Sequence, residues 1–64
     1  MLTINGESVE AAGKSLADSL REAGYDPARV AVERNLEIVP ADQFQTTILQ
    51  DGDTLEIVHF VQGG

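Results

Sequence analysis

The stretch that most constrains the fold is residues 54–61, a run of β-branched, aromatic and other apolar residues that follows an Asp-Gly pair. The pair favours a tight turn with positive φ, and the composition of the run predicts a strand. Because strand side chains alternate between faces, Leu55 and Ile57 share one face. Val58 and Phe60 share the other. A strand that is apolar on both faces is usually central in its sheet or covered on both sides. In a chain of only 64 residues, a partner protein is a candidate for covering the second face.

The residues after this strand carry few side chains, since the chain closes with Gln62, Gly63 and Gly64. Glycine fills no core and has the largest ordering cost, so a fold gains little from such an end. A chain end that enters a narrow active site gains room, because no Cβ obstructs it. The last four residues reach roughly 13 Å when extended, at about 3.3 Å each. We therefore predict one domain over 1–61 and a flexible tail over 62–64, with a frayed terminus as the alternative.

Composition excludes several classes of function. The 11 acidic and 4 basic residues give a net charge of −7, which argues against binding to a phosphate backbone. The acidity serves solubility, or it steers the chain toward a basic face on a partner. The absence of cysteine excludes a disulfide, a cysteine-ligated metal and a thiol nucleophile. No signal peptide and no apolar run of roughly 20 residues is present, so we expect a cytoplasmic protein.

Alternation and turn residues predict the other strands. Residues 1–4 alternate and lead into Asn-Gly, the strongest short-range hairpin signal, with a return strand over 7–11. Two further short strands are expected over 30–34 and 36–39, separated by an asparagine that tolerates positive φ. With the strand over 54–61, this makes a sheet of mixed direction if the last strand pairs in parallel with the first.

One short helix is expected between the hairpin and the later strands. Ser15 has the character of an N-cap residue, and Leu16, Leu20 and Ala23 follow at helical spacing as one apolar stripe. A helix of about two turns is not stable alone and must lie on the sheet. After the fourth strand, a single irregular turn brings Phe44 down as a plug for the core.

Residues inside the chain offer no catalytic constellation. His59 is the only histidine, it lacks a partner at metal-ligand spacing, and we interpret it as a half-exposed strand residue. Asp51 and Asp53 flank a glycine, and turn chemistry explains them better than a cation loop, which needs more oxygens. The reactive group that remains is the Gly64 carboxylate. It is a poor acyl donor until it is joined to AMP, and that activation requires ATP and a separate enzyme.

Seven short segments spread over the chain carry a resemblance to a known family: residues 5–7, 16–18, 30–35, 37–40, 49–53, 56–58 and 63–64. In this order they are similar to the ThiS family, the small sulfur carriers of bacterial thiamin biosynthesis. The resemblance implies an α+β fold of the ubiquitin-like β-grasp type, in which a mixed four- to five-stranded sheet packs on one main helix.

The resemblance also implies a role without enzymatic activity. A ThiF-like adenylating enzyme would consume ATP to activate Gly64, and a donor such as a cysteine desulfurase would supply sulfur for a thiocarboxylate. A ThiG-like thiazole synthase would then take that sulfur, while Gly63 provides clearance. The carrier itself would hold no cofactor or metal and would bind no nucleic acid or membrane. The predicted partner-binding residues are Val58, Phe60, Val61 and Gln62.

Three positions depart from the family pattern, and they leave other functions open. Ala41 stands where arginine is frequent, Phe44 stands where tryptophan is frequent, and Gln62 replaces a third glycine.

The alternatives to a thiamin sulfur carrier are a MoaD-like small subunit of molybdopterin synthase, a ubiquitin-like modifier joined to lysines, and a plain β-grasp scaffold. The absence of proline over 60–62 favours the thiamin carrier over the molybdopterin subunit.

Overall fold

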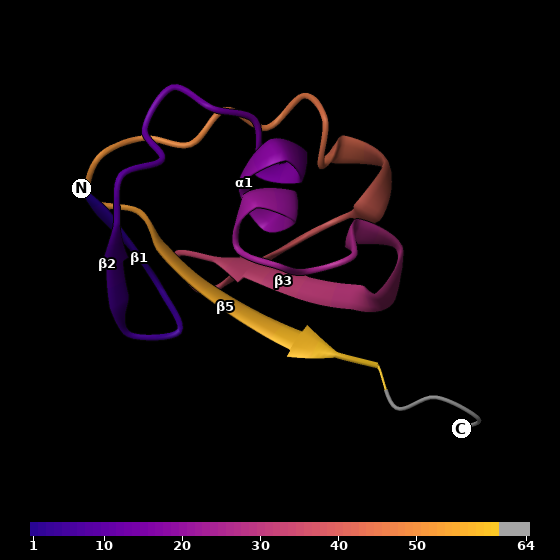
Figure 1. The fold of residues 1–64 in the computed structure, drawn as a ribbon. Coiled ribbons are helices and arrows are strands. Elements are labelled where there is room, and N and C mark those ends of the chain that lie inside the picture. The colour runs from indigo at the N-terminus through magenta and orange to yellow at the C-terminus, as the bar shows by residue number, and fades with distance from the viewer. Residues whose placement is uncertain (61–64) are drawn as a thin grey trace.

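The computed structural model describes residues 1–60, which form one five-stranded sheet with one α-helix on one of its faces (Figure 1). The strands are β1 (Leu2–Ile4), β2 (Glu7–Val9), β3 (Val30–Arg34), β4 (Glu37–Val39) and β5 (Thr54–His59). The helix is α1 (Leu16–Glu22), and the two short 3₁₀ helices are η1 (Pro27–Arg29) and η2 (Ala41–Gln43).

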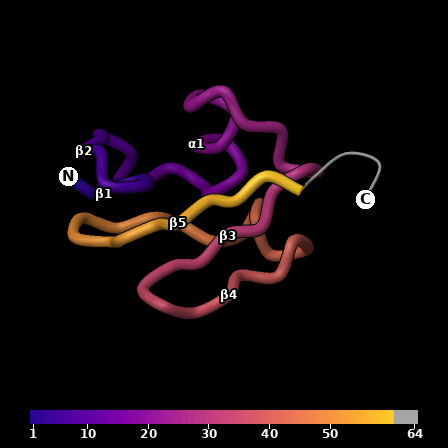
Figure 2. The backbone as a smooth tube through the Cα atoms, turned by 90° about the horizontal axis from the view of Figure 1, so that it is seen from below, coloured from indigo at the N-terminus to yellow at the C-terminus, as the bar shows by residue number. Residues whose placement is uncertain are grey.

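The sheet has the order β2-β1-β5-β3-β4, which places the last strand at its centre (Figure 2). β5 runs parallel to β1 and antiparallel to β3, and the hairpins β1–β2 and β3–β4 form the two edges. This is the β-grasp arrangement with a mixed sheet that the resemblance implies. The first and last strands do pair in parallel, the condition on which the expected mixed sheet depends.

The core lies between α1 and one face of the sheet. Ser15 caps the helix, because its hydroxyl accepts a hydrogen bond from the Asp18 amide at 3.1 Å. Phe44 is buried as the predicted plug. The core side chains are almost all aliphatic, and those with the least exposure are Leu2, Leu16, Leu20, Val32, Leu49 and Leu55.

Two sequence predictions about side-chain placement are wrong. Ala23 is exposed, because α1 ends at Glu22 and the third position of the expected stripe falls beyond the last turn. Ala17 and Ser19 are buried in its place. Leu36 is not a strand residue: it occupies the β3–β4 turn at φ 72° and is 90% exposed. Asn35 takes φ 52° before it, so the turn has two consecutive left-handed residues, as tight hairpins require.

Two strands are shorter than the sequence predicts. β2 ends at Val9, although Ala11 still enters the core. β5 ends at His59, with Phe60 continuing the hydrogen bonding. Residues 61–64 lie outside the described part of the chain, so the predicted tail stays a prediction.

Asp53 fixes the start of β5 from within a buried polar network. Its carboxylate accepts hydrogen bonds from the Gln50 amide at 2.9 Å, the Arg34 side chain at 2.9 Å and the Asn35 side chain at 3.0 Å. Burial alone would raise the pKa of Asp53, but these hydrogen bonds, together with the Arg34 charge, lower it below the usual 3.8. The turn before β5 is therefore held by an ionised aspartate.

We expect Asp53→Asn to destabilise the fold by about 2 kcal/mol at neutral pH, because three partly buried donors lose a charged acceptor. A lowered folded-state pKa means that the ionised form stabilises the fold above the unfolded pKa, and this contribution is lost as pH falls through the folded-state pKa. Urea unfolding between about pH 7 and pH 2 measures both effects. A wild-type acid transition that Asp53→Asn leaves unaltered contradicts the assignment.

Candidate functional site

The end of β5 is anchored to the body of the domain on both sides. β3 pairs with β5 from Arg34 opposite Leu55 to Val30 opposite His59. One residue later, the Phe60 amide donates to the Arg29 carbonyl at 2.9 Å. The backbone is thus held by the sheet up to residue 60, two residues before the predicted tail over 62–64.

Asn5 secures the other side of β5, a role that the sequence analysis missed. Its side-chain oxygen accepts from the Ile57 amide at 2.8 Å, and its side-chain nitrogen lies 3.2 Å from both the Ile57 carbonyl and the Tyr25 hydroxyl. The side chain therefore extends the β1–β5 pairing beyond the end of β1. Asn-Gly predicts the turn, but no sequence signal shows which distant strand the amide contacts.

An apolar surface remains open on the face of the sheet opposite α1. Val58 is 63% exposed and Phe60 is 62% exposed, and both lie on the outer face, as predicted. Ile38 on β4 adds to the same face and is 68% exposed. It was missed because its position beside β3 depends on strand pairing. Val58, Phe60 and Ile38, together with the half-buried Ala31 opposite Val58, are called the outer apolar face below.

The other predicted functional residues lie outside the described part of the chain. Val61 and Gln62 were expected to continue the partner-binding surface, and Gly63 and Gly64 to form the reactive end. Residues 1–60 present an uncovered apolar face that includes Phe60, the residue that precedes these four positions in the sequence. Such a face beside a chain end is suited to docking the body while the end enters another site.

Other surface features do not assemble a reaction centre in residues 1–60. His59 is exposed at the end of β5 and lies beside Tyr25, with ring centroids 5.1 Å apart and ring planes tilted by 39°. The described residues contain no group of three metal-ligating side chains. Within them, no helix has the length and apolarity needed to cross a membrane.

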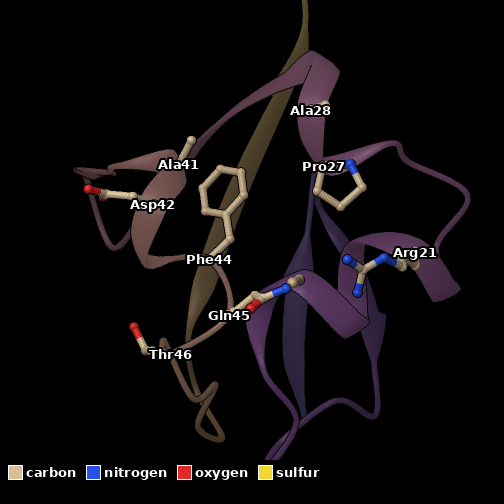
Figure 3. A pocket seen from close by; sticks show the side chains of 9 residues that line it. Arg21, Pro27, Ala28, Ala41, Asp42, Phe44, Gln45 and Thr46 are labelled. Atoms are coloured by element: carbon tan, nitrogen blue, oxygen red, sulfur yellow. The ribbon is translucent and has the colours of Figure 1, made fainter.

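The helix side of the molecule carries an open depression of about 410 Å³ between α1, η1 and η2 (Figure 3). Arg21 and Asp42 are its charged residues, and Arg21 is already within 3.3 Å of Asp18 on its own helix. Ala41, where relatives of the expected family often have arginine, lines it with a methyl group and supplies no charge. This depression therefore lacks the convergent polar groups of a ligand site.

Comparisons with known proteins agree on the family. The ThiS family model matches residues 2–64. The sulfur carrier protein ThiS of Bacillus subtilis is 38% identical, and the match covers 100% of both chains. The crystal structure of the thiamine biosynthesis protein (ThiS) from Geobacter metallireducens has a TM-score of 0.77 and 31% identity, with 98% of this chain and 97% of that chain covered.

A thiazole synthase of Paramagnetospirillum magneticum is also similar, with 48% identity over 64 residues. The match covers 98% of this chain and 20% of that protein, so the chain spans about a fifth of the length of this relative. A family match over nearly the whole chain, a full-length relative and a shared fold lead to one conclusion. The chain belongs to the ThiS family.

Proposed function

We propose that this chain is a sulfur carrier in thiamin biosynthesis and that the Gly64 carboxylate bears the sulfur. The family match over residues 2–64 carries the proposal, because it includes both terminal glycines. The outer apolar face supports it, since this surface includes Phe60, which lies close to Gly64 in the sequence. A carrier needs a docking surface and a reactive end, and it needs no catalytic residues of its own.

The chemistry follows from the weakness of a carboxylate as an acyl donor. A ThiF-like adenylating enzyme joins the Gly64 carboxylate to AMP from ATP, with release of pyrophosphate. The outer sulfur of a persulfide on a donor such as a cysteine desulfurase then attacks the acyl carbon, and AMP leaves, which gives an acyl disulfide. A thiol reductant cleaves the S–S bond of this intermediate, is itself oxidised to a disulfide, and leaves the thiocarboxylate on Gly64. Gly63 gives the adenylating site access to the acyl carbon, because it has no Cβ.

Thiazole synthase is the acceptor that we propose for the sulfur. The similarity to part of a thiazole synthase supports this choice, since that relative contains a segment like this chain. The named function of the Bacillus subtilis relative, a sulfur carrier, fits the same step. The chain then acts as a protein co-substrate of two enzymes and holds no cofactor.

Intact-mass measurement tests the proposal. The chain is incubated with the adenylating enzyme, ATP, a sulfur donor and a thiol reductant, and replacement of one oxygen by sulfur on the terminus raises its mass by about 16 Da. Omission of ATP is the control and leaves the mass unchanged. No mass increase in the complete mixture rejects the proposed function.

Phe60→Asp is expected to weaken binding to thiazole synthase at least about tenfold, because a charge replaces an exposed aromatic anchor on the docking face. The thermal midpoint and far-UV circular dichroism should be preserved, since Phe60 is outside the core. Leu36→Asp is the matched control: it introduces the same charge at an exposed residue in the β3–β4 turn, beyond the opposite end of the β3–β5 ladder. Equal affinities of the two variants contradict a docking role for Phe60.

A further inference from the structure

Two glutamates stand directly opposite each other on the outer face of the sheet. Glu33 on β3 pairs with Glu56 on β5, and Ile38 on β4 lies opposite Glu33 on its other side. Like charges at directly opposed positions destabilise a sheet. Within residues 1–60, neither carboxylate takes part in an ion pair. The free protein therefore carries an electrostatic repulsion that its own side chains leave uncompensated.

The same two glutamates border a shallow depression of about 190 Å³ in the outer apolar face. Ile38, Val58 and Ala31 line it as well, so apolar walls lie beside two carboxylates. This combination matches an arginine or lysine side chain. The aliphatic stem of such a side chain packs on apolar groups, and its cation is held between carboxylates. Arginine fits best, because its planar group donates to two carboxylates at once.

We propose that this depression receives a cationic side chain, arginine foremost, from thiazole synthase when the carrier docks. The inference rests on the proposed function and adds a specific recognition element to it. Charge complementarity supports the occupant, since the chain has a net charge of −7 and presents these carboxylates next to the outer apolar face. Thiazole synthase is chosen because a relative of that name contains a segment similar to this chain.

The proposal requires that removal of the Glu33 and Glu56 charges changes the stability of the free carrier and its affinity for thiazole synthase in opposite directions. In the free carrier, the Glu33–Glu56 pair costs stability, whereas in the complex a guanidinium between the two carboxylates turns the repulsion into attraction. Removal of both charges therefore stabilises the free protein and weakens the complex. A merely solvated pair of surface glutamates would give only the first effect.

The test uses the full chain with Glu33→Gln and Glu56→Gln together, titrated with thiazole synthase at about 50 mM and about 500 mM salt. We expect the thermal midpoint to rise by about 2–5 °C. At low salt the affinity should fall at least about tenfold, and most of its salt dependence should disappear. The double variant Glu7→Gln with Glu10→Gln is the matched control, because it makes the same change in net charge away from this depression. Its affinity should stay within about twofold of wild type.

Three results would overturn the inference. The first is an unchanged affinity of the Glu33 and Glu56 variant. The second is an equal loss in the control variant, which would indicate charge steering without a specific contact. The third is a failure of the wild-type chain to bind thiazole synthase. If the two substitutions weaken binding to the adenylating enzyme but leave binding to thiazole synthase unchanged, the proposed partner is wrong. The mass measurement decides the proposed function separately, because formation of the thiocarboxylate does not require thiazole synthase.

Discussion

Deletion of Gly63 and Gly64 is expected to reduce thiazole formation at least about a hundredfold in a reconstituted mixture with the adenylating enzyme, sulfur donor and thiazole synthase. The deletion moves the terminal carboxylate to Gln62 and shortens the chain end by roughly 7 Å. Misplacement of a reacting group by even about 1 Å costs on the order of a hundredfold in rate. Unfolding measurements should match wild type, since the core lies within residues 1–60.

Gln62→Gly is the control for this deletion. It restores the three-glycine end that is frequent in the family and keeps the length of the chain, so we expect full activity. Thiazole formation by the deleted chain at the wild-type rate would show that the terminal glycines do not carry the sulfur. Equal loss of activity in both variants would show that the chain end does not tolerate a change at Gln62 either, so the loss on deletion would not be specific to the two glycines.

Leu20→Ala is expected to have the largest effect on stability. Leu20 is fully buried where α1 packs on the sheet, and truncation of such a side chain costs about 3–4 kcal/mol. A domain of this size has a total stability of about 3–10 kcal/mol. The variant should therefore be partly unfolded near 37 °C, as thermal denaturation followed by circular dichroism would show.

Leu36→Ala is the matched control, because the same side-chain change is made at a residue that is 90% exposed. Its stability should lie within about 0.5 kcal/mol of wild type. If the two leucine variants unfold at the same temperature, α1 does not depend on the packing of Leu20 for its place on the sheet.

Much of the fold follows from local signals in the sequence. Asn-Gly predicts the β1–β2 hairpin, and Ser15 predicts the beginning of α1. The errors have local causes as well. Ala23 fits the helical period, but the period does not report where the helix ends, and α1 stops before reaching it. Leu36 resembles a strand residue by composition, whereas the turn after Asn35 requires a positive φ from whichever residue follows.

The candidate docking face could be predicted only in part. Val58 and Phe60 follow from alternation along a single strand. Glu56 follows from the same alternation, because it lies two residues before Val58 on β5. Ile38 and Glu33 join that face through strand pairing, which depends on contacts between distant parts of the chain. The same reason explains why the Asn5 contact with β5 was missed. Contacts between side chains on different strands can be predicted only when the register of the strands is known.

The predictions for the body of the domain and those for its end have different outcomes. The parallel pairing of β1 with β5 confirms the predicted architecture. The roles of Gly63 and Gly64 remain predictions, because these residues lie beyond the described part of the chain. The proposed function therefore depends on chemistry at the terminus more than on any contact within the fold.

A single-turnover transfer experiment tests that chemistry most directly. The chain is charged with heavy-isotope sulfur, separated from ATP and the sulfur donor, and mixed with thiazole synthase and its other substrates. The account predicts that labelled sulfur appears in the thiazole in an amount equal to the charged carrier consumed, while the carrier returns to its uncharged mass. Thiazole that contains no label, formed while the carrier keeps its sulfur, would contradict the account.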